Sequence, residues 1–109
     1  MVGAMAAPVV HYTLTGKTAI VAMDDGKANA LSMAMLDELD AALTRAEAEA
    51  SAVVLTGRPE RFCAGFDLRV MMSSPDAAIA LLRRGAELLL RLFALPLPLV
   101  IAANGHALA

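Results

Sequence analysis

The stretch that decides the fold spans residues 53–68 and reads VVLTGRPERFCAGFDL. It begins within Ala52–Thr56, a short apolar run typical of a fully buried strand. The charged residues 58–61 predict a loop. Gly65 then lies among apolar residues, directly before a short helical pattern over 68–72. A glycine in this position indicates a sharp turn or a close approach of the backbone.

The residues before this stretch predict two strands and a long helix. Val9–Leu14 and Thr18–Met23 have the character of two strands that form a hairpin. Ser32 is expected to cap a helix over Met33–Glu49. The apolar residues of this helix recur at helical spacing, at Leu36, Leu39, Leu43 and Ala46.

The residues after it predict a second long helix and a further strand. Ser74 and Pro75 have the residue types of a cap and a first turn, and Pro96 ends the helix. Two apolar stripes run along it, so we expect burial on two sides. One stripe is Ile79, Leu82, Ala86, Leu89 and Phe93, and the other is Leu81, Leu88 and Leu92. Leu99–Ala103 predicts another buried strand. Strands alternating with helices indicate the α/β class.

Composition limits the classes of function. The chain has 109 residues, of which 59% are hydrophobic, above the usual range of about 45–50%. This excess predicts surface that other protein covers. The net charge is −2 and Arg83-Arg84 is the one adjacent basic pair, so we expect no nucleic-acid partner. The single cysteine, Cys63, rules out an internal disulfide framework, and the cytoplasm is the expected compartment.

Neither end of the chain predicts a targeting or membrane segment. Residues 1–8 contain no Lys or Arg, so we expect a disordered start and not a signal peptide. Residues 92–109 approach the length of a membrane span. Pro96 and Pro98 interrupt this stretch, however, and no membrane span is expected.

Several familiar motifs fail on inspection. Gly16-Lys17-Thr18 resembles the end of a phosphate-binding loop, but His11 stands where that motif needs a glycine. Cys63 and His106 could in principle form a nucleophile–base pair. Nothing nearby in the sequence would activate Cys63, so a packed apolar cysteine is expected. His11 and His106 make no better case as metal ligands, and we expect no metal site.

Three segments, in this order and at this spacing, resemble the N-terminal half of the enoyl-CoA hydratase/isomerase (crotonase) family: residues 27–32, 53–68 and 98–109. The resemblance covers nearly the whole chain from about Val9. It implies that residues 1–109 are the N-terminal portion of a single crotonase-like domain. The implied fold is a spiral of strand–strand–helix turns, truncated after roughly its first half. The family usually assembles as homotrimers or dimers of trimers.

The resemblance also implies an acyl-CoA substrate, with coenzyme A as part of the substrate and no separate cofactor. In the matching family motif, the N–H of the residue after the glycine, here Phe66, forms half of an oxyanion hole for the thioester oxygen. Such a donor is worth roughly 3–4 kcal/mol when charge develops on that oxygen. The positions that match CoA-contacting residues of the family are Lys27, Ala28, Ala64, Gly65, Asp67 and Leu68.

Two departures from the family pattern matter. Phe66 is bulkier than the small residue most common at this position, so a narrowed acyl pocket is expected. The resemblance also places the second oxyanion donor and the catalytic glutamates beyond Ala109. The leading hypothesis is part of an enzyme that hydrates 2-enoyl-CoA, and other reactions of the family stay open. The alternatives are a non-catalytic acyl-CoA-binding or assembly module and an unrelated buried α/β domain.

Overall fold

A computed structural model of the chain describes residues 7–108, so most of the predicted disordered start lies outside the described residues. Strands and helices alternate along the chain, as the α/β prediction requires. In chain order the elements are β1 (Val10–Thr15), β2 (Thr18–Met23), β3 (Ala30–Leu31), α1 (Met33–Glu49), β4 (Ala52–Thr56), β5 (Glu60–Cys63), β6 (Gly65–Phe66), α2 (Leu68–Met71), α3 (Pro75–Phe93), β7 (Leu99–Ala102) and β8 (Gly105–Ala107).

The strands form one larger sheet and two short parallel pairs. The larger sheet has the order β1-β2-β4-β7, in which β1 is antiparallel to β2 and the other neighbours are parallel. β3 pairs with β6, and β5 pairs with β8. Each strand–strand–helix turn of the chain therefore pairs its strands in parallel with the equivalent strands of the preceding turn. This is the spiral of strand–strand–helix turns that the resemblance implies.

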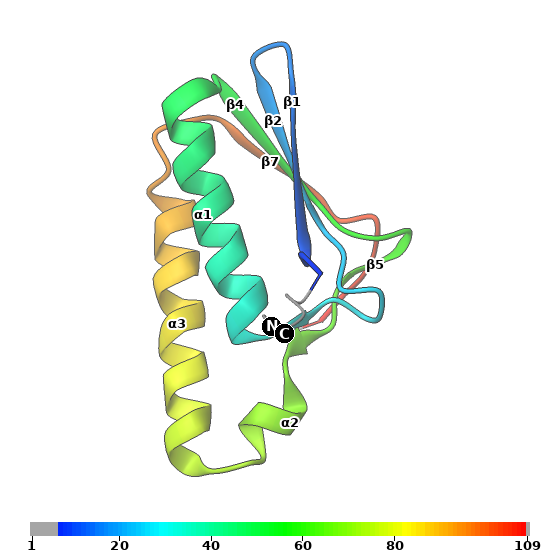
Figure 1. Cartoon of the computed structure of the whole chain (residues 1–109), viewed down its shortest axis with the longest axis vertical. Coiled ribbons are helices and arrows are strands. Elements are labelled where there is room, and N and C mark those ends of the chain that lie inside the picture. Colours follow the sequence, from blue (N-terminus) through cyan, green and yellow to red (C-terminus); the bar gives the residue numbers. More distant parts are fainter. Residues whose placement is uncertain (1–6, 109) are drawn as a thin grey trace, which may run out of the picture.

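Helix α1 covers one face of the larger sheet, and α3 runs beside it (Figure 1). The Ser32 hydroxyl accepts a hydrogen bond from the Met35 N–H at 3.1 Å, which confirms the predicted cap. The predicted apolar stripe of α1 is buried, together with Met35 and Ala42. It packs with Ala19, Val21, Met23, Val53 and Leu55 of the sheet into one aliphatic core.

Helix α3 is buried on one side only, which corrects the prediction of burial on two sides. Ser74 caps it, as predicted, through a 3.1 Å hydrogen bond from the Ala77 N–H. The buried residues are Leu81, Gly85 and Leu88, whereas the stripe that contains Leu89 and Phe93 faces outward. Within residues 7–108 no element covers that stripe. The predicted buried strand at β7 is likewise open, since Val100 and Ile101 are exposed.

Ion pairs fasten α3 to α1 beside the apolar contact. Arg84 donates to Asp37 at 3.0 Å and to Asp40 at 3.2 Å. Arg91 donates to Asp40 and to Glu47, each at 2.6 Å. The hydrogen bond from Arg91 and then that from Arg84 hold the pKa of the Asp40 carboxyl below its ordinary value, although its partial burial opposes the shift. Together these ion pairs join α3 to three acidic residues of α1.

A single buried amide joins the ends of several strands. Asn29 is fully buried. Its amide group donates to the Met23 carbonyl at 2.9 Å and to the Arg61 carbonyl at 3.1 Å, and its side-chain oxygen accepts from the Asp25 N–H at 3.0 Å. Its φ of 63° lies in the left-handed region, which asparagine tolerates better than most residues. Asn29 thus holds the 24–29 turn against β2 and β5.

The shortest elements differ from the sequence prediction. Part of the predicted loop at 58–61 belongs to strand β5, and β3, β6 and β8 were not predicted at all. β3, β6 and β8 have two or three residues each, too few to show an alternating pattern. Among residues 7–108, no helix has both the length and the apolarity that crossing a bilayer demands.

We expect the 109-residue chain to self-associate through the outward face of α3, because large exposed apolar patches promote association. Leu90→Glu combined with Phe93→Glu should shift the chain toward monomer, and Leu14→Glu on β1 should not. Sedimentation velocity measures both. A wild-type chain that sediments as a sharp monomer at micromolar concentration would contradict the prediction.

We expect the Asn29 amide to be a main determinant of stability. Asn29→Gly keeps the left-handed backbone but removes the side-chain partner of three carbonyls and of the Asp25 N–H, so it should lower the free energy of unfolding by on the order of 2–3 kcal/mol. Asn29→Ala should cost about 1 kcal/mol more, because an alanine Cβ is strained at this φ. Urea titration followed by circular dichroism gives both values. Equal losses for the two variants would show that the backbone conformation is not a constraint.

Candidate functional site

The candidate site is built around β6, a two-residue strand held on one edge by β3. Gly65 and Phe66 pair with Ala30 and Leu31. The Asp67 N–H donates to the Leu31 carbonyl at 3.1 Å, just after Phe66. Successive N–H groups of an extended strand point to opposite edges. The Phe66 N–H is therefore directed away from β3.

The backbone before Phe66 needs a glycine. Gly65 has a φ of 87°, which side chains other than hydrogen rarely permit, and it is buried. Its N–H points to the Cys63 Sγ at 3.3 Å. Cys63 belongs to the hydrophobic core, as expected of a packed cysteine, whereas His106 is exposed. These two surroundings give no support to a nucleophile–base pair.

An apolar cavity of about 460 Å³ lies between the sheet and α3. Every described residue that lines it is apolar or glycine, and Phe66 is one of them. Leu89 and Ile101 also line it, and they are 64% and 52% exposed, so the cavity is open on that side. A space of this size and lining suits a hydrocarbon group and offers no polar side chain to a charged one.

The Phe66 ring lies directly against the backbone of α3 at Gly85. A Cβ placed on Gly85 would be 2.5 Å from Cε1 and 2.7 Å from Cζ of the ring. Gly85 is buried in the middle of the helix, where glycine normally weakens a helix by about 0.5–1 kcal/mol relative to alanine. The ring occupies the space that any larger residue at position 85 would need.

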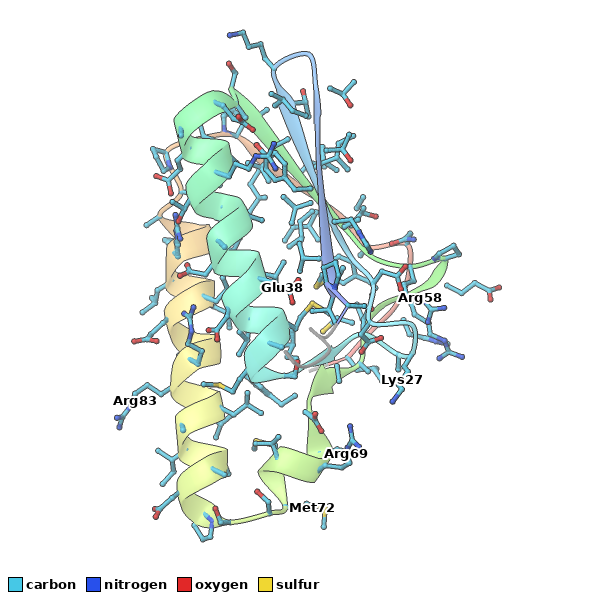
Figure 2. The ribbon with its side chains drawn as sticks, viewed as in Figure 1. Lys27, Glu38, Arg58, Arg69, Met72 and Arg83 are labelled. Carbon is cyan, nitrogen blue, oxygen red and sulfur yellow. The ribbon has the colours of Figure 1, made fainter. Side chains whose placement is uncertain are left out.

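A second, polar cavity of about 440 Å³ lies where the 24–29 turn and β3 meet the start of α2. Its lining carries both signs of charge: Asp25, Lys27, Ala28, Ala30, Ser32, Asp67 and Arg69. Figure 2 shows Lys27 and Arg69 at the same edge of the molecule, with Arg83 pointing outward from the opposite edge. Lys27 and Arg69 are both exposed, so they can reach an anionic ligand.

The two carboxylates of the polar cavity are largely occupied by the protein itself. Asp25 accepts from the N–H groups of Lys27, Asn29 and Ala30 at 2.7–3.0 Å. Burial raises the pKa of Asp25, but these backbone donors outweigh it and the net pKa is lowered. Asp67 caps α2 by accepting from the Arg69 N–H at 3.0 Å. Both carboxylates thus fix loops, and Asp67 also lies 3.9 Å from the Arg69 guanidinium, which leaves Lys27 and the outer part of Arg69 to meet a ligand.

The structure brings most of the predicted site residues together. Lys27, Ala28 and Asp67 line the polar cavity, and Gly65 and Phe66 form the strand beside it. Ala64 is half-buried, and its N–H donates to the Asn29 carbonyl at 3.0 Å. Leu68 stands apart, because it is 72% exposed and lines neither cavity.

Three residues of the two cavities escaped sequence reasoning. Asp25 directly precedes Gly26, and an Asp-Gly turn beside Lys27 could have suggested a carboxylate held by backbone N–H groups. Arg69 follows Asp67 by two residues, so its charge was visible, but its direction was not. Gly85 carried one signal, a glycine inside a strongly helical pattern. Within residues 7–108, no cluster of three or more His, Cys, Asp or Glu is placed to hold a metal ion.

Comparisons with known proteins identify the family of the chain. The family described as Enoyl-CoA hydratase/isomerase matches residues 15–109. A probable enoyl-CoA hydratase of Rhodobacter capsulatus is 39% identical over 100 residues, which are 90% of this chain and 39% of that protein. The 2,3-dehydroadipyl-CoA hydratase of Escherichia coli is 41% identical over 80 residues, which are 73% of this chain and 30% of that protein.

Solved structures show the same relation. An enoyl-CoA hydratase/isomerase family protein of Pseudomonas syringae superposes with a TM-score of 0.91 at 39% identity, covering 93% of this chain and 44% of that one. Human mitochondrial delta3-delta2-enoyl-CoA isomerase gives a TM-score of 0.81 at 33% identity, covering 89% and 40%. The chain thus spans well under half the length of these relatives. With a match over residues 15–109 and a shared fold, the chain belongs to the enoyl-CoA hydratase/isomerase family.

Proposed function

We propose that this chain supplies the CoA-binding surface and one oxyanion donor of an enzyme that acts on acyl-CoA thioesters, with hydration of a 2-enoyl-CoA as its reaction. The observation that carries the proposal is the junction at residues 66 and 67. Phe66 lines the apolar cavity, and Asp67, the next residue, lines the polar cavity with Lys27 and Arg69. A ligand with a hydrocarbon part and an anionic part fits two such cavities at once.

The chemistry of the reaction explains why a backbone N–H is useful at this junction. Addition of water across an alkene conjugated to a thioester places negative charge on the carbonyl oxygen. A fixed N–H directed at that oxygen stabilises the charge without rearranging during the reaction. The Phe66 N–H, directed away from β3, is our candidate donor. The family resemblance assigns the second donor and the glutamates that handle water and protons to positions beyond residue 109.

This proposal includes an assembly and a compartment. The outward apolar stripe of α3 and the open strand β7 indicate surface that further protein covers, and the family resemblance implies a homotrimer or a dimer of trimers for the whole protein. The single cysteine, Cys63, is buried and free, which supports the reducing cytoplasm as the compartment.

If the chain is part of such an enzyme, residues 1–109 alone should bind acyl-CoA and give no turnover of crotonyl-CoA above a buffer control.

The first test concerns the Phe66 N–H. The wild-type chain should bind octanoyl-CoA about fivefold more tightly than its thioether analogue, which lacks the carbonyl oxygen, since one hydrogen bond is worth about 1 kcal/mol. Phe66→Pro removes the N–H and should abolish this preference, whereas Phe66→Ala should keep it. Titration calorimetry measures the ratio, and circular dichroism checks the fold of each variant.

The same pair of variants extends to catalysis. In a protein in which this chain is continued to the length of its relatives, Phe66→Pro should lower kcat by on the order of a hundred- to a thousandfold. Phe66→Ala should stay within about tenfold of wild type on short acyl chains, a change of roughly 1.4 kcal/mol in the barrier. A folded proline variant with near-normal turnover would show that Phe66 is not an oxyanion donor.

The second test uses the two lysines of the chain as a matched pair. Lys27→Gln should weaken binding of free CoA about fivefold, a loss of about 1 kcal/mol for an exposed ion pair. Lys17→Gln, in the turn between β1 and β2 and outside the polar cavity, should leave it unchanged. Raising the salt concentration should shrink the difference between the two variants. Equal losses for both would contradict a phosphate-binding role for Lys27.

A further inference from the structure

The contact between Phe66 and Gly85 has a feature that the family resemblance does not explain. A glycine inside α3 leaves a bare patch of helix backbone, and the edge of the Phe66 ring lies on that patch. Cε1 and Cζ are the two atoms in close contact, while Cδ1 is 3.8 Å from the added Cβ position. The edge of the ring therefore occupies the space that a Cβ at position 85 would fill.

This contact forms part of the wall of the apolar cavity. Phe66 and Gly85 both line it, and so does Leu88, one helical turn after Gly85. A methyl group added at position 85 would push the ring off α3 and into the space of the cavity. Removal of the ring would enlarge the cavity beside the helix backbone at Gly85. The size of the side chains at positions 66 and 85 thus controls the depth of the cavity at this end.

We infer that Phe66 and Gly85 together close one end of the apolar cavity and set the longest straight alkyl chain that it accepts. The inference rests on the proposed function in one respect, namely that this alkyl chain is the acyl part of a CoA thioester. The wall is apolar throughout its described residues, so each buried methylene should improve affinity about fourfold until the chain meets the ring. Beyond that length, further methylenes should add nothing.

The experiment is a chain-length series on the 109-residue chain. Binding of straight-chain acyl-CoAs from butyryl to dodecanoyl is measured by titration calorimetry. Binding of 1-alkanols of the same lengths is measured by NMR, and these probes contain no CoA. The variants are Phe66→Ala, Phe66→Leu, Gly85→Ala and the double variant Phe66→Ala/Gly85→Ala. Ala86→Gly, at an exposed position of α3, controls for changes in helix stability.

For both ligand series we expect affinity to rise about fourfold per methylene up to a limiting length and then to level off. Phe66→Ala should move the limit to longer chains by about two carbons or more, and Gly85→Ala should move it to shorter chains. The double variant should behave like Phe66→Ala, because the new methyl group then meets no ring. Ala86→Gly should leave the limit where it is.

An unchanged limit in Phe66→Ala, Phe66→Leu and Gly85→Ala, with native circular dichroism, would overturn the inference. If Phe66→Ala does not fold, Phe66→Leu, whose smaller side chain should move the limit to longer chains, and Gly85→Ala, which should move it to shorter chains, still decide the inference. If the alkanol limits move as expected but no acyl-CoA binds, the Phe66–Gly85 wall is supported and the proposed function fails. If acyl-CoAs bind with a limit that no variant moves, the proposed function stands and the wall is wrong.

Discussion

The hydrogen bonds of the buried Asn29 amide are the constraint on which the rest of the structure depends. The Asn29 side chain forms hydrogen bonds with the end of β2, the 24–29 turn and strand β5. The backbone carbonyl of Asn29 also accepts a hydrogen bond from the Ala64 N–H. The segments that meet at this residue carry Lys27 on one side and Gly65-Phe66 on the other. The relative position of the two cavities therefore depends on a residue that lines neither of them.

Local signals explain why the long elements could be predicted from the sequence. Ser32 and Ser74 are helix caps whose partners lie three residues away, and α1 repeats its apolar residues over many turns. The rest of the fold depends on contacts between distant residues. Strands β3 and β6 exist because they pair with each other, and the Arg91–Asp40 ion pair joins residues 51 positions apart. Burial of the α3 stripe that contains Leu89 and Phe93 was predicted wrongly, because periodicity identifies an apolar face but does not show which element covers it.

The candidate site likewise has features that the sequence could predict and features that it could not. The motif around Gly65 drew attention to β6, and the family resemblance supplied the roles proposed for Phe66 and Lys27. No sequence pattern could show that the Phe66 ring lies on Gly85, since that contact is made across the core between a strand and a helix. Arg69 is similar: its charge is evident in the sequence, but its place in the polar cavity depends on the turn that α2 makes.

The parallel pairing of β4 with β7 has a consequence for the order in which the chain folds. The β1–β2 hairpin closes through the short turn at Gly16, whereas β4 and β7 join residues as far as 46 positions apart, with α3 between them. Closing so long a loop costs entropy that a hairpin does not pay, so distant parallel pairings form slowly. We therefore expect the hairpin and α1 to assemble first and to offer the edge of β4 as a template. Strand β7 would dock on it last, and until then that open edge would be the part of the folding chain most exposed to pairing with the wrong partner.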